Sequence, residues 1–291
     1  MARPSRSSVS SRGNCWVEGV YHDPAPIGGI AGGLLLGTAA LTGTSVSGPL
    51  LVAAVCGTAL VYALDRAVAP SPEDDWNHPR RRAWVQRHWA WLIVEGGLLL
   101  AGGAGALLYL SGRTLLVAAV LAGAAGAHLL PGLRSNRLRT VQGVVKPFLV
   151  AAAWAAGSTL LPLVETGTSL SAVGGGVFVY RFLLVLPNVL LSDWGDRAGD
   201  RAAGLRPWPA WGSVRVLRRT ATALLLVAAV GAVGLGWATG RWLLFGVDAV
   251  GPLLMTAAVW RLDPTRPDHR FWLDAVVAWP AVTALVGWGG A

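Results

Sequence analysis

Charged residues are scarce in this sequence, at 13% of 291 positions, and acidic residues are fewer than basic ones, with 15 Asp and Glu against 24 Lys and Arg. A soluble globular domain usually has about 25% charged residues, so an ordinary soluble domain is not expected. The two cysteines, Cys15 and Cys56, fall in a polar tail and in an apolar stretch, which makes a disulfide between them improbable. Lys146 is the only lysine.

Several catalytic signatures are also absent from the sequence. It contains no His/Cys cluster with zinc spacing, no Walker-type phosphate loop and no serine-nucleophile elbow. Residues 1–24 are polar, so we expect no cleavable signal peptide. The sequence therefore offers no support for a zinc enzyme, a P-loop nucleotide-binding protein or a serine hydrolase.

Apolar residues, by contrast, make up 54% of the chain, and the mean hydropathy is +0.52. Nine stretches are long enough, or nearly so, to cross a ~30 Å hydrocarbon core as helices. Their many Leu, Ala, Val and Gly residues suit helices that pack closely through small side chains. The stretches are residues 27–44, 50–67, 89–110, 114–131, 144–164, 174–192, 218–238, 242–260 and 271–289.

Arginine alternates between the connections of these stretches. It is frequent in the N-terminal segment and after the second, fourth, sixth and eighth stretches, whereas the other connections carry only Arg113 and Arg241. By the positive-inside rule, the N-terminus is cytoplasmic and the C-terminus lies outside. The net charge of +9 then faces anionic lipid and does not imply nucleic-acid binding. We predict an all-α, nine-helix integral membrane domain over residues 25–291, after a cytoplasmic tail over residues 1–24, in the plasma or inner membrane.

Three aspartates follow the sixth stretch in the run Asp-Trp-Gly-Asp-Arg-Ala-Gly-Asp, at positions 193, 196 and 200. On a helix this spacing puts all three on one face. The simpler interpretation is a solvated helix end at which the aspartates pair with Arg197 and Arg201. That interpretation leaves Asp196 and Asp200 stacked on each other, so we favour a site for a hard divalent cation, which usually brings a phosphate with it.

A second acidic cluster follows the second stretch, on the same predicted side of the membrane. Asp65 lies at the end of that stretch, and residues 73–79 continue with Glu-Asp-Asp-Trp-Asn-His-Pro. Two carboxylate groups that face each other across a helical bundle are suited to hold two or more Mg²⁺ ions, which would bind the oxygens of a diphosphate.

With these two clusters the chain resembles the UbiA superfamily of intramembrane prenyltransferases, which have nine transmembrane helices and two aspartate-rich motifs. Residues 193–206 follow the family pattern Asp-x-x-Asp-x-x-x-Asp with its trailing Gly. In the first motif, Val61 and Tyr62 stand where the family has Asn-Asp, and Asp65 matches the next aspartate. Residues 74–79 resemble the tail of that motif, displaced by a short insertion.

The resemblance implies a transferase, with Mg²⁺ as cofactor, that moves a prenyl group from a prenyl diphosphate to an aromatic or other lipophilic acceptor at the cytoplasmic surface. The diphosphate leaves, and the acceptor captures the allylic carbocation. The resemblance implies that the catalytic carboxylates are Asp65, Asp193, Asp196 and Asp200, and that these and Asp74 are the metal ligands. The candidate substrate contacts are Asn77, Lys146, Arg181, Asn188 and Arg201.

Other polar and aromatic residues have competing interpretations. Arg181 lies midway along an apolar stretch, so it needs a cavity or a carboxylate partner, and Lys146 has a topogenic role or a diphosphate contact. The aromatic rings of Trp154, Tyr180 and Trp194 could stabilise a carbocation, although most tryptophans here suit interfacial belts. Glu95, His128, Asp248 and Asp274 suit a proton path or a base at an acceptor site, but we favour internal pairing for each. We expect His78 and His269 to be solvated.

Two alternative functions stay open at this stage. A membrane terpene cyclase on the same scaffold would capture the carbocation with the substrate's own double bonds. A transporter or a catalytically silent lipid-binding relative is the third possibility, but the sequence shows no internal repeat of the kind that many transporters use.

Overall fold

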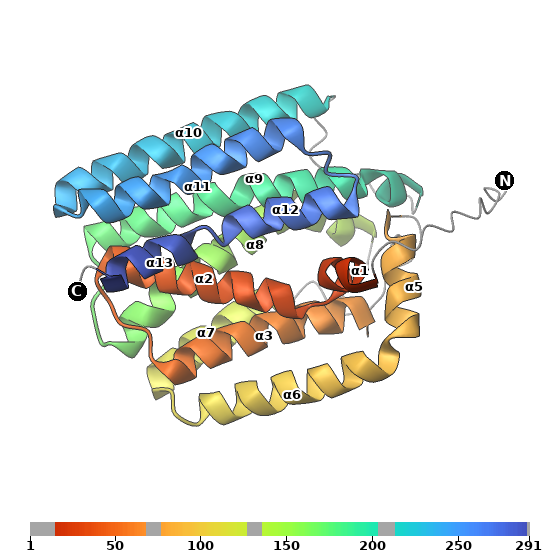
Figure 1. Cartoon of the computed structure of the whole chain (residues 1–291), viewed down its shortest axis with the longest axis horizontal. Helices are drawn as coiled ribbons and strands as arrows, with labels where there is room; N and C mark the ends of the chain where they lie inside the picture. The colour runs from red at the N-terminus through yellow and green to blue at the C-terminus, as the bar shows by residue number, and fades with distance from the viewer. Residues whose placement is uncertain (1–14, 68–76, 127–135, 203–212, 290–291) are drawn as a thin grey trace, which may run out of the picture.

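The computed structural model describes residues 15–67, 77–126, 136–202 and 213–289 (Figure 1). Within these ranges the chain is helical and has no strand. Eight segments of the described chain are long and apolar enough to cross a membrane. They are α2 (Ala25–Thr42), α3 (Gly48–Ala67), α6 (Trp89–Leu107), α8 (Asn136–Glu165), α9 (Ala172–Ala202), α10 (Val214–Thr239), α11 (Trp242–Arg261) and the pair α12 (Pro267–Val277) and α13 (Pro280–Gly289).

One predicted span differs from the other eight. The stretch predicted over residues 114–131 coincides with α7 (Gly112–Gly126), which has 15 residues. The rest of that stretch falls in residues 127–135, outside the described part of the chain. The all-helical, multi-span architecture is confirmed, whereas a ninth crossing and a cytoplasmic N-terminus stay predictions.

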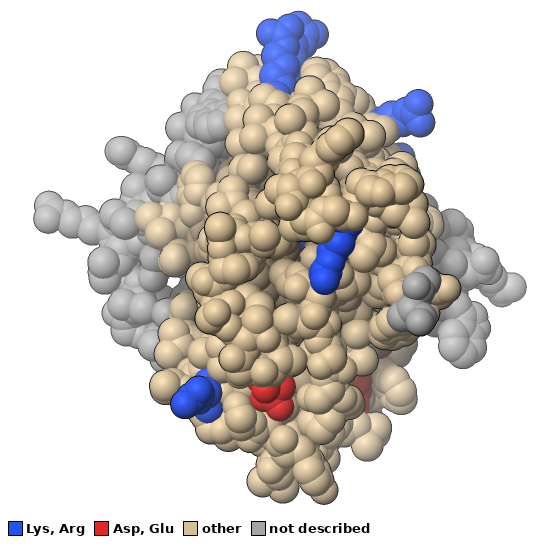
Figure 2. All heavy atoms as spheres, turned by 90° about the vertical axis from the view of Figure 1, so that its left-hand side faces the viewer, with Lys and Arg blue, Asp and Glu red and all other residues tan. Residues whose placement is uncertain are grey.

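The two ends of the bundle differ in charge. The short helices α1 (Cys15–His22) and α5 (Pro79–Arg87) lie at the end on the right of Figure 1, where α5 carries four arginines. The opposite end, which faces the viewer in Figure 2, is covered mostly by uncharged side chains. This asymmetry is what the alternation of arginine in the sequence predicts.

Large apolar side chains cover the outward faces of the helices. Leu98 and Leu100 of α6, and Val230 and Trp237 of α10, are all exposed. Exposed apolar surface on this scale is unfavourable in water but is matched to a hydrocarbon environment. The surface therefore agrees with the length of the helices in indicating a membrane protein.

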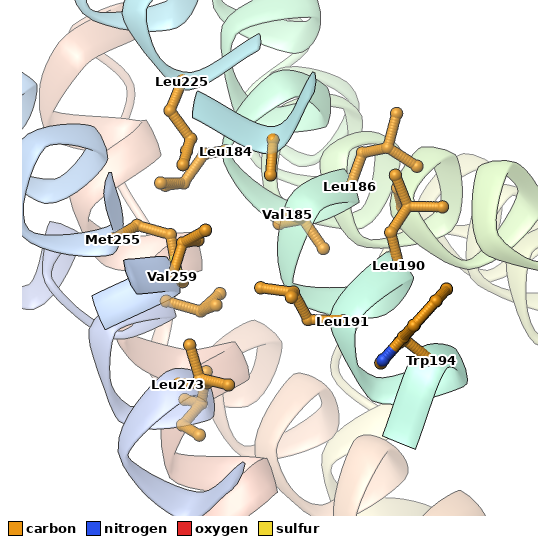
Figure 3. Packing of buried hydrophobic residues seen from close by; sticks show 14 of the residues in the cluster. Leu184, Val185, Leu186, Leu190, Leu191, Trp194, Leu225, Met255, Val259 and Leu273 are labelled. Carbon is orange, nitrogen blue, oxygen red and sulfur yellow. The ribbon is translucent and has the colours of Figure 1, made fainter. Parts of the chain in front are cut away.

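The main hydrophobic core lies around α9 (Figure 3). Leu184 and Leu191 of α9 are buried there on the side of Leu225 of α10 and Met255 of α11, and Leu190 is buried on the other side of α9. Lipid tails are as apolar as these side chains, so the helices gain little hydrophobic free energy from associating and depend on close packing instead.

The last span is broken, which its apolar sequence does not indicate. Helix α12 ends at Val277 and α13 begins at Pro280. Proline has no backbone N–H and its ring obstructs the preceding turn, so a continuous helix is unfavourable at this point. The indole Nε1 of Trp279, in the break, donates to the backbone oxygen of Val247 in α11 at 2.8 Å.

The same break brings α13 into backbone contact with α2. A Cβ atom at Gly37 would overlap the backbone oxygen of Pro280. Gly29, on the same helix, has nothing within 4 Å of the equivalent position. Small residues allow such close approach of membrane helices, so Gly37 is needed for packing and Gly29 is not.

We expect Gly37→Ala to destabilise the protein by about 1–3 kcal/mol, because the backbone of α13 would have to move. Gly29→Ala, the matched control, should be neutral or stabilising by up to about 1 kcal/mol, since alanine favours helix. Thermal unfolding midpoints of the two variants in detergent measure the difference. Equal midpoints would contradict the close packing of α2 on α13.

Candidate functional site

The second acidic motif lies on the last three turns of α9, and its residues are helical, as their spacing predicts. The helix continues through Ala202, so Asp193, Asp196 and Asp200 are all helical. Asp193 and Asp196 are partly exposed, and the side chain of Asp200 lies outside the described part of the structure. Asp74 of the first motif also lies outside the described residues.

Asp196 is the best-defined carboxylate of the site. Its Oδ1 atom lies 2.7 Å from Nη2 of Arg270 in α12 and 3.0 Å from Nε2 of His78. The Asp196 side chain keeps 28% of its surface exposed. The simpler interpretation, a solvated helix end, paired the aspartates with Arg197 and Arg201, but the described partners of Asp196 are Arg270 and His78. The Arg197 guanidinium instead lies over the Trp194 ring, 3.7 Å from its centroid.

His78, which we expected to be solvated, is mostly buried, with 13% of its side chain exposed. Burial is the main reason that its pKa is lowered, and the charge of Arg81 lowers the pKa further, against the opposing effect of Asp196. His78 is therefore favoured as a neutral hydrogen-bond partner at neutral pH. The expectation was wrong because it treated residues 77–79 as an isolated loop, without the surface of α9 that covers them.

Asn77 makes the second contact between the two motifs. Its Oδ1 accepts a hydrogen bond of 2.7 Å from the backbone N–H of Gly199. A Cβ atom at Gly199 would overlap the Asn77 side chain, and one at Gly195 would overlap Arg270 and the backbone oxygen of Pro264. The two glycines of the motif therefore make room for the tail of the first motif and for α12.

Arg270 is the functional candidate that the sequence analysis missed. Its Nη1 lies 3.2 Å from Nε2 of His78, and its Nη2 donates to the backbone oxygen of Ser192 at 3.3 Å. In the sequence, Arg270 is one of many arginines in the alternate connections. Those arginines indicate membrane orientation, so Arg270 did not stand out as a functional residue. Arg270 lies in the first turn of α12, three positions after Pro267. This helical position separates it from the arginines of the connection.

A second polar layer lies deeper in the bundle. Nδ2 of Asn188, a predicted substrate contact, donates to Oδ1 of Asp274 at 2.8 Å. Tyr62 of α3 interacts with Asp274 and with Asp65, and its hydroxyl is a hydrogen-bond partner of Trp154 in α8. Asp65 of the first motif and Asn188, which precedes the second motif in α9, thus share neighbours in one region.

Arg181, by contrast, lies outside this region and has no exposed surface. Its Nη1 and Nη2 donate to the two oxygens of Asp248 at 2.6 and 3.0 Å, and its Nε donates to Thr38 at 2.8 Å. The hydroxyl of Tyr180 also donates to Asp248, at 2.5 Å. Arg181 was expected to face either a cavity or a carboxylate partner, and the carboxylate partner is confirmed. We therefore withdraw Arg181 and Tyr180 as candidates for contact with a substrate.

The other predicted residues lie at the surface. Lys146 in the first half of α8 and Arg201 at the end of α9 are both exposed. Within the described residues, no group of three His, Cys, Asp or Glu side chains is arranged to hold a metal ion. The arrangement that is described joins the Asp196 carboxylate to one arginine, Arg270, and to the neutral His78 at the junction of the two motifs.

No family model, curated protein or solved structure matches this chain.

The glycines of α9 give a direct test of the junction. Gly195→Ala should destabilise the protein by about 1–3 kcal/mol, because the backbone of the α11–α12 connection must shift. Gly199→Ala should cost less, since only the flexible Asn77 side chain has to move. Gly231→Ala in α10, where nothing lies within 4 Å, is the control. Thermal unfolding in detergent ranks the three variants, and any other order would contradict the described packing.

The buried ion pair gives a second test. Arg181→Met leaves the Asp248 carboxylate buried without its partner, which should cost about 3–5 kcal/mol. The double variant Arg181→Met/Asp248→Leu should recover most of this loss, because neither charge is then left unpaired. Equilibrium unfolding in detergent measures both variants. A double variant that is no more stable than the single one would show that the pair does not act as a unit.

Proposed function

We propose that this chain is an intramembrane prenyltransferase of the UbiA type, which moves a prenyl group from an isoprenoid diphosphate to a lipophilic acceptor at the cytoplasmic surface. The observation that carries the proposal is the contact between the two acidic motifs. Asn77 bonds to Gly199, 122 positions along the chain, and His78 bonds to Asp196 one helical turn earlier. A diphosphate site that needs carboxylates from both motifs requires such a junction.

The chemistry of the donor set fits Mg²⁺, which prefers carboxylate oxygens. Asp65, Asp193 and Asp196, with Asp74 and Asp200, are the proposed ligands. Both described contacts of Asp196 engage its Oδ1 atom, so Arg270 and His78 hold the carboxylate in position through one oxygen. Bound Mg²⁺ would supply positive charge that stabilises the departing diphosphate.

Aromatic side chains of the deeper layer are suited to the next part of the reaction. Tyr62 and Trp154 are partly buried and pack against the main core, and Tyr62 interacts with Asp274. The faces of such rings stabilise a cation by about 1–2 kcal/mol when water is excluded. We propose that they shield the allylic carbocation from water until the acceptor reaches it.

A terpene cyclase is the second candidate, and Tyr62 is the feature that favours it. This residue stands where the resembled family has an aspartate, and it puts an aromatic ring beside Trp154. Arg181 and Asp248, which would serve an ion pathway in a transporter, form a closed pair with Tyr180 and Thr38. That pairing counts against transport.

We expect the purified protein to release pyrophosphate from an isoprenoid diphosphate only in the presence of Mg²⁺. Asp193→Asn should lower the rate about 100-fold, since it weakens the electrostatic stabilisation of the leaving group. Asp268→Asn, which removes an exposed carboxylate paired with Arg266 at the start of α12, should leave the rate unchanged. A coupled pyrophosphate assay, across a panel of diphosphates and acceptors, provides the measurement.

Two outcomes of this assay change the proposal. Product formed from the diphosphate alone would indicate a cyclase. No Mg²⁺-dependent release with any member of the panel would rule out both enzymes for the substrates tested and leave a non-catalytic role.

A further inference from the structure

Two carboxyl groups meet where the connection between α1 and α2 lies against α6. Asp23 belongs to that connection, and Glu95 lies in the second turn of α6. Nε1 of Trp91, one helical turn before Glu95 on the same face of α6, donates to Oδ2 of Asp23 at 3.3 Å. The side chains of Asp23 and Glu95 are also hydrogen-bonded to each other. The start of α2 is therefore joined to α6 through two acidic groups.

The surroundings of Glu95 disfavour an ionised carboxylate. Only 7% of the residue is exposed, and among the described residues its Oε2 atom has no hydrogen-bond partner. A buried carboxylate oxygen without a donor is costly, whereas the neutral acid loses much less solvation. Two ionised carboxylates in contact also repel each other, unless a proton or another cation lies between them.

The donors around the pair indicate which group keeps the negative charge. Asp23 accepts from the Trp91 indole and, at 2.8 Å, from the backbone N–H of Ala25 in the first turn of α2. Glu95 shares only the backbone donor. Hydrogen bonds from N–H groups at the N-terminus of a helix stabilise a carboxylate. Asp23 is therefore the better carboxylate, and Glu95 is the acid that donates to it.

Arg66 disfavours a metal ion as the bridge between the two groups. Its Nη1 donates at 2.8 Å to the backbone oxygen of His22, the residue before Asp23. Among the described charged residues, Asp23 and Arg66 affect Glu95 most. A fixed positive charge repels a second cation, but it balances the single negative charge that remains when the pair holds one proton.

We propose that Asp23 and Glu95 form a proton-binding site, in which Glu95 stays protonated at neutral pH and the bound proton holds the start of α2 against α6. Loss of the proton would leave two negative charges in contact and loosen this end of the bundle. The ring of Tyr21, in the same segment, packs on Phe271 of α12 with centroids 5.2 Å apart, next to Arg270 of the candidate site. The inference does not depend on the proposed function.

The test compares thermal unfolding midpoints of the full-length wild type and Glu95→Gln in detergent, from about pH 6 to about pH 9, where a glutamate in an unfolded chain is ionised. The folded wild type then binds one proton more than the unfolded chain, so its stability falls as the pH rises. The glutamine amide donates to Asp23 without a bound proton. We expect the midpoint of Glu95→Gln to equal or exceed that of the wild type, by a difference that grows with pH.

Glu165→Gln in α8 is the matched control. The described contacts of Glu165 are donors, the hydroxyl of Thr114 and the backbone N–H of Ser111, so this carboxylate is suited to be ionised. Its replacement should change the midpoint by the same amount at every pH in this range. A loss of stability in Glu95→Gln that is likewise independent of pH would overturn the inference, because it would indicate an ionised Glu95 held by Arg66 or by a bound cation.

Infrared spectroscopy detects the proton directly. The difference spectrum between the wild type and Glu95→Gln at neutral pH should contain the C=O stretching band of a protonated carboxyl group. A difference spectrum with carboxylate bands alone would reject the proton-binding site, whatever the midpoints show. If Glu95→Gln does not fold, Glu95→Met, which is also uncharged, replaces it in this measurement.

Discussion

Charged side chains inside a hydrocarbon layer must be paired. Helix α9 takes part in two ion pairs, one within its apolar part and one near its C-terminal end. Arg181 bonds to both oxygens of Asp248 in α11, and Asp196 bonds to Arg270 in α12. Each pair fixes the rotation of α9, because a turn of the helix would leave a charge without its partner. The leucines of α9 pack in the main core on more than one side of the helix.

The candidate site follows from where the second of these pairs lies. Gly195 and Gly199 remove side chains from the surface of α9, so that Arg270 and Asn77 approach its backbone. The tail of the first motif is thereby held against the second motif. The proposed chemistry needs this junction, because carboxylates of both motifs would hold the divalent cation.

Sequence patterns predicted the helical architecture well, for a physical reason. The thickness of the bilayer sets the length of each apolar stretch, so the spans can be recognised without knowing their neighbours. The spacing of Asp193, Asp196 and Asp200 likewise indicated a helix, because helical periodicity is local. The backbone contact at Gly37 was not predicted, since it depends on how α13 meets α2. The break before Pro280 was not predicted either, because proline alone does not decide it, and Pro187 and Pro252 lie inside continuous helices.

By itself the sequence determined the fold class, the position of the helices and the two acidic motifs, since each depends on residues close together in the chain. The tertiary structure decided the partners. It assigned Asp248 to Arg181, joined His78 and Arg270 to Asp196, and brought His22 to Arg66. These contacts join residues on different helices, and the same hydropathy pattern would allow many other arrangements of those helices. Only packing at the scale of single side chains selects among them.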